Sequence, residues 1–251
     1  MFSVTISKAS YEPGGSLSVS GTVTSTSRGN PPGAITIDVD SSTGAGRVVT
    51  NHGMEGTDYS WKGPLPDGVT VIEGDQVEVW SHRQSHAKAP IALKKSLAFT
   101  MEHQTQVNWC WAAVGASVGN FFWGTGTYTQ CEIANTCQQK TTCCTSPGGC
   151  NQYGWLEKAL AAAKSFDRYE RATIEFAALQ SQINSEKLIG TRVKWNSGGA
   201  HFMVISGYDT DGDTIEIKDP WYGTSVMVFA SYPASYHGGG TWTTTYYTEK
   251  N

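Results

Sequence analysis

The chain contains 251 residues, which suits one large domain or two modest ones. Charged side chains make up 16% of the residues and the formal net charge is −4, so no phosphate-neutralising surface is expected and nucleic acid is excluded as the expected partner. No apolar run approaches the ~20 residues that a membrane-spanning helix needs. The first ten residues, MFSVTISKAS, alternate like a strand and lack the basic start and long apolar stretch of a signal peptide. A mature secreted chain with an added Met would look the same, so secretion stays open.

The distribution of cysteines divides the chain into two regions. The first 109 residues contain no cysteine, whereas five of the six lie within twenty residues of one another. The six are Cys110, Cys131, Cys137, Cys143, Cys144 and Cys150.

Residues 1–98 are expected to form an all-β immunoglobulin-like sandwich. The segments SLSVSGTVTST and AITIDVD alternate with period two, and further strands are expected around RVVT, DYSWKG, GDQVEVWSH and KKSLAFT. About seven short strands separated by Gly, Pro, Asn and Asp turns are typical of such sandwiches. The region has no Cys…Trp…Cys pattern, so only the architecture is implied. It also offers no candidate catalytic residue.

Residues 99–251 are expected to form an α+β domain. Helices are predicted in WCWAAVGASVGNFF, TYTQCEIANTCQQ, YGWLEKALAAAKS and TIEFAALQSQINSE. Strands follow in LIGTRVKW, HFMVISGYD, TIEIKDPW, SVMVFASY and TWTTTYYTE. Helices first and an antiparallel sheet afterwards indicate the α+β class. The chain is therefore predicted to have two domains, 1–98 and 99–251.

Cys110 is the candidate nucleophile. It stands at the start of the first predicted helix, where the positive end of the helix dipole favours a thiolate. Gln104 lies six residues upstream, and its side-chain amide together with the Cys110 backbone N–H could form an oxyanion hole. The alternative is a buried structural cysteine.

His201 and Asp219 are the candidate base and its orienting acid. The sequence GGAHFMVISGYDTDGDTIEIKDPW reads as a hairpin whose turn is centred near residues 210–211. Position 201 then pairs with roughly 219–221 on the facing strand. Cys110, His201 and Asp219 follow the nucleophile–base–orienter logic of a cysteine hydrolase. The two glycines before His201 leave room for a substrate backbone.

Each of these residues has a structural alternative. His201 could be a satisfied strand histidine, and Asp219 before a proline could be a turn residue. DTDGD resembles a calcium loop, but its glycine is at the fourth position and no glutamate stands at the twelfth, which favours a hairpin turn. His103 and His237 are rival bases: His103 is too near Cys110 in sequence to face it easily, and His237 has no acid placed to orient it.

The sequence resembles the papain-like cysteine peptidases. The resemblance rests on Gln104-Thr-Gln-Val-Asn-Trp-Cys110-Trp-Ala-Ala, the cysteines at 143–150, Gly-Gly-Ala-His201 and Asp219-Pro-Trp221, and covers about residues 99–251. Within that superfamily the sequence is most similar to bacterial members, in the branch that includes secreted effector proteases and bacteriocin-leader peptidases. The resemblance implies Cys110 as nucleophile, His201 as base and acid, Asp219 as orienter and Gln104, favoured over Gln106, as oxyanion donor. It also implies that Trp221 shields the base–orienter contact.

The five clustered cysteines are interpreted as a disulfide-bearing segment. They show no C-x-x-C pair and no histidine among them, which argues against zinc. Two bridges among five cysteines, without one between the adjacent Cys143 and Cys144, can be drawn in about twelve ways. At least one cysteine stays unpaired, and free thiols or a metal remain alternatives. Bridges would indicate an oxidising compartment, so a secreted or translocated protein is expected.

Together these features predict a cysteine endopeptidase that needs no cofactor and no metal and acts on a protein or peptide substrate. The N-terminal region is expected to bind a partner or the catalytic domain as a targeting, inhibitory or positioning module. Two other readings stay open. One is a papain-fold amidase or acyltransferase, acting on peptidoglycan or like a transglutaminase; the other is a catalytically dead binding module.

Overall fold

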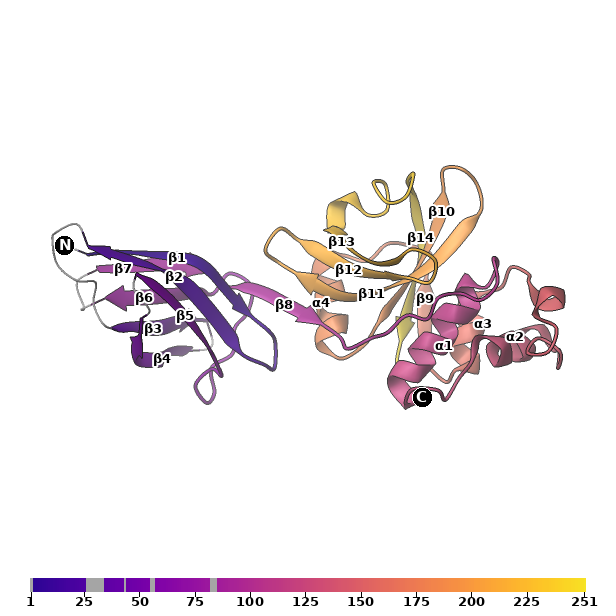
Figure 1. The fold of residues 1–251 in the computed structure, drawn as a ribbon, viewed down its shortest axis with the longest axis horizontal. Helices are drawn as coiled ribbons and strands as arrows, with labels where there is room; N and C mark the ends of the chain where they lie inside the picture. Colours follow the sequence, from indigo (N-terminus) through magenta and orange to yellow (C-terminus); the bar gives the residue numbers. More distant parts are fainter. Residues whose placement is uncertain (1, 26–33, 43, 55–56, 82–84) are drawn as a thin grey trace. The chain divides into compact units, whose positions relative to one another are not determined.

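The computed structural model describes residues 2–25, 34–42, 44–54, 57–81 and 85–251. Contacts divide the chain into two compact units, both drawn in Figure 1. The first unit comprises Met1–Lys94 with Asp209–Asp211, and the second comprises Lys95–Tyr208 with Gly212–Asn251. The domain boundary expected between residues 98 and 99 stays a prediction.

The first unit consists of β-strands in two sheets. One has the order β5-β2-β1-β8, where β8 runs parallel to β1 at Ala92 and Leu93, and the other has the order β4-β3-β6-β7. The strands are β1 (Phe2–Tyr11), β2 (Leu17–Ser25), β3 (Ala34–Ser41), β4 (Gly44–Gly53), β5 (Asp58–Gly63), β6 (Gln76–Ser81), β7 (Ser85–Pro90) and β8 (Ala92–Ser96).

Alternating apolar side chains supply the core of this unit. Ile35, Ile37 and Val39 of β3 and Val77 and Val79 of β6 are fully buried. Strand β1 contacts both β6 and β7 of the other sheet. The period-two pattern of the sequence thus turns one face of each strand toward a shared interior.

The strands expected around RVVT, DYSWKG and GDQVEVWSH are confirmed as parts of β4, β5 and β6. The strand expected around KKSLAFT is present as β8 but ends at Ser96. The segment SHAKAP forms β7, which the sequence analysis missed. Among the described residues, β7 pairs with β6 at the end of its sheet, which makes it an edge strand. An edge position tolerates proline and lysine and needs no alternation of large apolar residues, so its sequence carries little signal.

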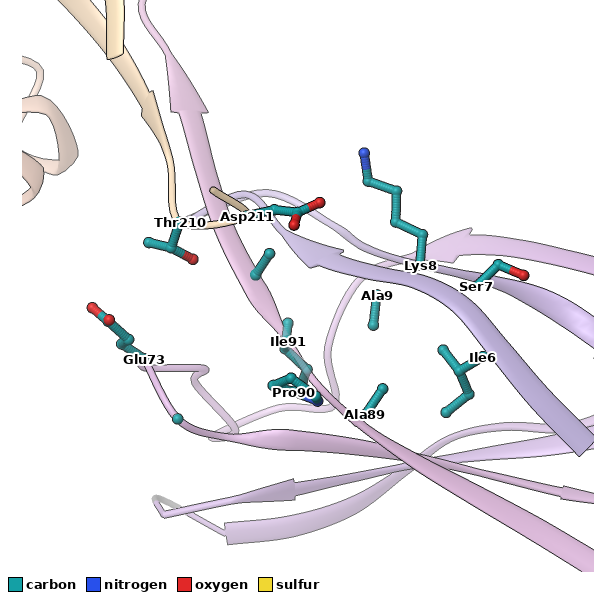
Figure 2. Close-up of a pocket in the computed structure, with 12 residues that line it drawn as sticks. Ile6, Ser7, Lys8, Ala9, Glu73, Ala89, Pro90, Ile91, Thr210 and Asp211 are labelled. Atoms are coloured by element: carbon teal, nitrogen blue, oxygen red, sulfur yellow. The ribbon is translucent and has the colours of Figure 1, made fainter. Parts of the chain in front are cut away.

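One pocket of about 420 Å³ belongs to the first unit. Figure 2 shows its floor of Ile6, Ala9, Ala89 and Ile91, with Lys8 and other charged side chains at the rim. The described residues that line it include neither cysteine nor histidine. The predicted chemistry therefore lies elsewhere.

The second unit combines helices with an antiparallel sheet. The sheet has the order β11-β10-β14-β9, and β12 pairs with β11 and β13. Figure 1 shows α1, α2 and α3 together beside the sheet, and α3 contacts both β9 and β14. The elements are α1 (Cys110–Trp123), α2 (Gln130–Gln138), α3 (Leu156–Ala162), β9 (Phe166–Glu170), α4 (Phe176–Asn184), β10 (Ile189–Trp195), β11 (Ala200–Asp209), β12 (Thr214–Asp219), β13 (Gly223–Val228) and β14 (Gly240–Thr248), with short 3₁₀ turns at Pro147–Cys150 and Phe229–Ser231.

All four predicted helices and the five later strands are present. Two details differ. The predicted strand SVMVFASY ends at Val228, where a 3₁₀ turn begins, and FDRYE forms the unpredicted strand β9. Strand β9 pairs only with β14, about eighty residues further along the chain. That long-range pairing, rather than local propensity, makes it a strand.

Helix α1 is the centre of the helical layer. Its residues from Cys110 to Gly119 are all buried, and Gly124, at φ 107°, ends the helix. Small residues let α3 approach closely: a Cβ built on Gly115 would lie 2.7 Å from the Cβ of Ala159 and 3.1 Å from its carbonyl carbon. The glycine is therefore required by close helix packing.

Two disulfides join Cys131 to Cys144 and Cys143 to Cys150, while Cys110 and Cys137 are free. The expectation of bridges within residues 131–150, with one cysteine of that group unpaired, is confirmed. Among the described residues, no helix is both long and apolar enough to cross a bilayer.

We expect Gly115→Ala to destabilise the second unit by about 1–3 kcal/mol, because the added methyl group overpacks against the α3 backbone. This loss outweighs the gain in helix propensity, about 1 kcal/mol, that alanine brings. Gly148→Ala is the matched control, because a Cβ there meets nothing within 4 Å. Urea unfolding followed by tryptophan fluorescence measures both changes. Equal stabilities of the two variants would contradict the close α1–α3 packing.

Peptide mapping under non-reducing conditions should recover the 131–144 and 143–150 bridges. Each closes a short loop and contributes about 2–4 kcal/mol in a loop-entropy description. Cys110 and Cys137 should be alkylated after denaturation without a reductant. Recovery of Cys137 in a bridge would contradict the pairing.

Candidate active site

Three of the predicted site residues meet in the second unit, each at the end of a different element. Cys110 is the first residue of α1, His201 lies at the start of β11, and Asp219 is the last residue of β12. His201 Nε2 lies 2.8 Å from Asp219 Oδ1, and Cys110 acts together with Asp219 to raise the pKa of His201. Since Nε2 is bonded to Asp219, Nδ1 is the nitrogen left to face the thiol.

The Asp219 carboxylate is fully buried and surrounded by donors. Oδ1 accepts from the backbone N–H groups of Trp221 (2.7 Å) and Tyr222 (3.0 Å) as well as facing His201, and Oδ2 accepts from the Tyr236 hydroxyl at 3.1 Å. Burial acts to raise its pKa, but the bond to His201, the imidazolium charge and the two N–H groups outweigh burial and lower the pKa. Asp219 is therefore an anion that fixes the imidazole.

His201 is nearly buried, with 11% of its side chain exposed. Burial acts to lower its pKa, but the hydrogen bonds and charges of Asp219 and Cys110 raise the pKa to about 9. The Trp195 ring stacks on the imidazole with centroids 5.9 Å apart, and on Tyr236 at 6.3 Å. At neutral pH the His201 side chain is thus favoured as an imidazolium.

The loop that leads into Cys110 is held by the disulfide-bonded segment. Asn108 donates two hydrogen bonds to Asn151, from its backbone N–H to the side-chain oxygen and from its side-chain amide to the carbonyl. The Trp109 indole donates to the Cys150 carbonyl, and the Trp111 indole donates to the Gln152 carbonyl. These bonds fix the helix start. The Cys110 backbone N–H is among the first of α1 and has no partner within the helix.

Gln104 is buried close to this helix start. Its Nε2 donates to the carbonyls of Gln106 (2.9 Å) and Val107 (2.7 Å), and its Oε1 has no partner among the described residues. In this arrangement Gln104 shapes the turn before α1. To act as an oxyanion donor, it must exchange one of these two bonds for the substrate oxygen.

The structure also places the rival and auxiliary residues. The His103 ring packs on Trp221 with centroids 5.4 Å apart, and the His237 ring stacks on Tyr222 at 3.8 Å. Trp195 is the ring that stacks on the His201 imidazole, whereas the Trp221 ring lies against His103 and is 43% exposed; the shielding role of Trp221 stays a prediction.

A cleft of about 380 Å³ opens beside Cys110. One wall is formed by Trp111, Tyr153 and Trp155, and another by Arg192 and Lys194 of β10 with Ala200 and Phe202 of β11. Cys110 thus lies at a groove large enough to accept an amino-acid side chain. Within the described part of the chain, no group of three or more His, Cys, Asp or Glu residues is placed to hold a metal ion.

Comparison with known families agrees with this geometry. The family model described as "Peptidase_C39 like family" matches residues 96–248. The chain belongs to the Peptidase_C39 like family. Residues 96–248 are accordingly a domain related to papain-like cysteine peptidases. No curated protein matches the sequence.

Sequence analysis of this family member missed Trp195 and Tyr236. Trp195 ends the strand that precedes the two glycines, and Val193 pairs with His201, so the short hairpin spacing could have placed a ring near the imidazole. Tyr236 lies on an irregular loop between β13 and β14 and reaches Asp219 across 17 residues. No local spacing signals that contact.

The titration of His201 tests the pair directly. We expect the His201 imidazole of the parent protein to titrate near pH 9. NMR follows this titration, and the loss of the signal in His201→Gln assigns it to His201. Asp219→Asn removes the carboxylate charge that raises the pKa and should shift the titration downward. Because the folded-state pKa is raised, the linked stability is fully present below the unfolded value of 6.5 and is lost as pH rises through about 9. A parent titration below pH 6.5 would contradict the pairing.

Proposed function

We propose that the chain is a cysteine peptidase that hydrolyses peptide bonds through Cys110, His201 and Asp219. The observation that carries the proposal is that His201 Nε2 lies 2.8 Å from Oδ1 of the buried Asp219, while Cys110, at the start of α1, acts together with Asp219 to raise the pKa of His201. This is the order of contacts that a nucleophile, base and orienter require. The family membership supports a peptidase-related fold for the same residues.

Acylation begins with the Cys110 thiolate and the His201 imidazolium. Sγ attacks the carbonyl carbon of the scissile bond, and the negative charge moves to the carbonyl oxygen. The Cys110 N–H donates to that oxygen at the helix start, where the dipole favours negative charge, and Gln104 is the proposed second donor. As the C–N bond breaks, His201 gives its proton to the leaving amine and a thioester remains.

Deacylation uses the same residues in reverse roles. Neutral His201 takes a proton from water, and the resulting hydroxide attacks the thioester carbonyl. The C–S bond breaks, the carboxylic acid leaves, and the thiolate–imidazolium pair is restored. Asp219 holds the ring toward Cys110 in both halves and stabilises the imidazolium.

The first unit is proposed to be an immunoglobulin-like sandwich that targets, inhibits or positions the peptidase. Its two sheets with alternating buried residues support that architecture. Two disulfides are compatible with an extracytoplasmic protein. A place in the bacterial effector or leader-peptidase branch remains part of the proposal.

The other acyl chemistries share these residues and differ in their substrate. An amidase or acyltransferase would label at Cys110 but would not cleave a peptide library. A dead binding module would show no selective labelling of Cys110. Labelling and library cleavage, measured together, separate the three.

Cys110→Ala should lower peptide hydrolysis by at least about three orders of magnitude, because the covalent step is lost. Iodoacetamide at pH 7 should label the parent stoichiometrically at Cys110, read out by mass spectrometry. Cys137→Ala is the matched control. That thiol is free and half-buried, and burial raises its pKa to about 11, so this variant should keep both the activity and the label.

Two results would count against the proposal. Activity of Cys110→Ala within tenfold of the parent would exclude Cys110 as the nucleophile. Equal labelling of both free cysteines in the native protein would show that the site does not activate Cys110.

A further inference from the structure

The cleft beside Cys110 carries two cations on one strand. Arg192 and Lys194 both line it and stand two residues apart on β10, so their side chains leave the same face of the sheet. The chain as a whole has a net charge of −4. The cations therefore contrast with the overall charge of the protein.

Strand register fixes these cations relative to the catalytic histidine. In the β10–β11 pair, Lys194 lies opposite Ala200, Val193 opposite His201 and Arg192 opposite Phe202. Directly opposed residues share a face, so the two cations lie across from the neighbours of His201 on either side. Because both strands belong to the sheet, the spacing between cations and base is rigid.

Neither cation has an acidic partner within the described residues. No carboxylate there comes within 4.0 Å of Arg192 or Lys194, whereas several surface lysines and arginines are paired. Arg192 Nη1 donates to Thr243 Oγ1 at 3.0 Å, which orients the guanidinium. Lys194 is exposed. Among the described residues, the two cations that line the cleft thus have no ion-pair partner within 4.0 Å.

The opposite wall supplies apolar contact. Trp155 is 58% exposed and Tyr153 is 82% exposed although both are large aromatic residues. Aromatic surface beside a fixed guanidinium suits a side chain that has an apolar stem and an anionic end.

We propose that Arg192 and Lys194 determine specificity by receiving an acidic side chain, Asp or Glu, of the peptide substrate. This inference rests on the proposed function, since it names the substrate class of the same site. Charge-assisted hydrogen bonds from the two cations to the carboxylate provide the selectivity.

The test measures binding and cleavage separately. Acetylated and amidated hexapeptide libraries, in which Glu replaces Gln one position at a time, contain the side chain as their only carboxylate. Fluorescence titration on Cys110→Ala reports binding, and the parent enzyme reports kcat/KM. At one position, Glu should be preferred over Gln by about tenfold or more, and the preference should weaken in high salt.

Charge variants assign the preference to the two residues. Lys194→Gln and Arg192→Gln should each reduce it, and the double variant should abolish it. Arg171→Gln is the matched control, because Arg171 is an exposed cation of the second unit that does not line the cleft. It should keep the full preference. Far-ultraviolet circular dichroism and thermal unfolding verify that each variant is folded.

The outcomes separate this inference from the proposed function. Peptide hydrolysis with no preference for Glu at any position overturns the acidic specificity and leaves the peptidase intact. A preference in binding to Cys110→Ala, with no hydrolysis by the parent, supports the cationic cleft and overturns the peptidase. A preference that survives in the folded double variant, or that appears only for peptides with a free C-terminal carboxylate, overturns the inference.

Discussion

The second unit depends on burying one carboxylate without leaving it unpaired. Asp219 has no exposed side-chain surface, and an isolated charge there would be prohibitively costly. Four donors from three segments form hydrogen bonds to the carboxylate: His201, the backbone N–H groups of Trp221 and Tyr222, and the Tyr236 hydroxyl. Because all four must converge, the end of β12, the turn after it and the loop before β14 are fixed together. The orientation of the imidazole follows from the same convergence.

The nucleophile is positioned by a separate set of constraints in the helical layer. Gly115 lets α1 pack on α3, and residues 150–152 hold the segment from Asn108 to Trp111. The Cys143–Cys150 bridge in turn restrains Cys150, the first residue of the segment 150–152. A disulfide far from the reaction in sequence therefore acts on the place where Cys110 enters the helix. Cys110 and His201 are therefore positioned by two separately braced parts of the second unit, the start of α1 and the start of β11.

The part of the site that local periodicity controls could be predicted. The hairpin spacing placed Asp219 near His201, and the run of small residues placed Cys110 at a helix start. Contacts made across long separations could not be predicted. Strand β9, Tyr236 and the hydrogen bonds of Gln104 depend on tertiary neighbours. The cysteine spacing likewise indicated two bridges but left their pairing open, because connectivity is decided by the fold of residues 131–150.

The pleat of β10 and β11 places His201 and the side chains that line the cleft on opposite faces of the sheet. Val193 and His201 are paired and share one face, and Val193 is fully buried, so the imidazole is anchored on the core side of the sheet. Arg192, Lys194, Ala200 and Phe202 occupy the other face and line the cleft. Side chains on the cleft face can therefore change without moving the imidazole, since none of these four is a hydrogen-bond partner of His201 or Asp219 among the described residues. A period-two strand thus allows substrate preference to vary while the catalytic geometry is retained.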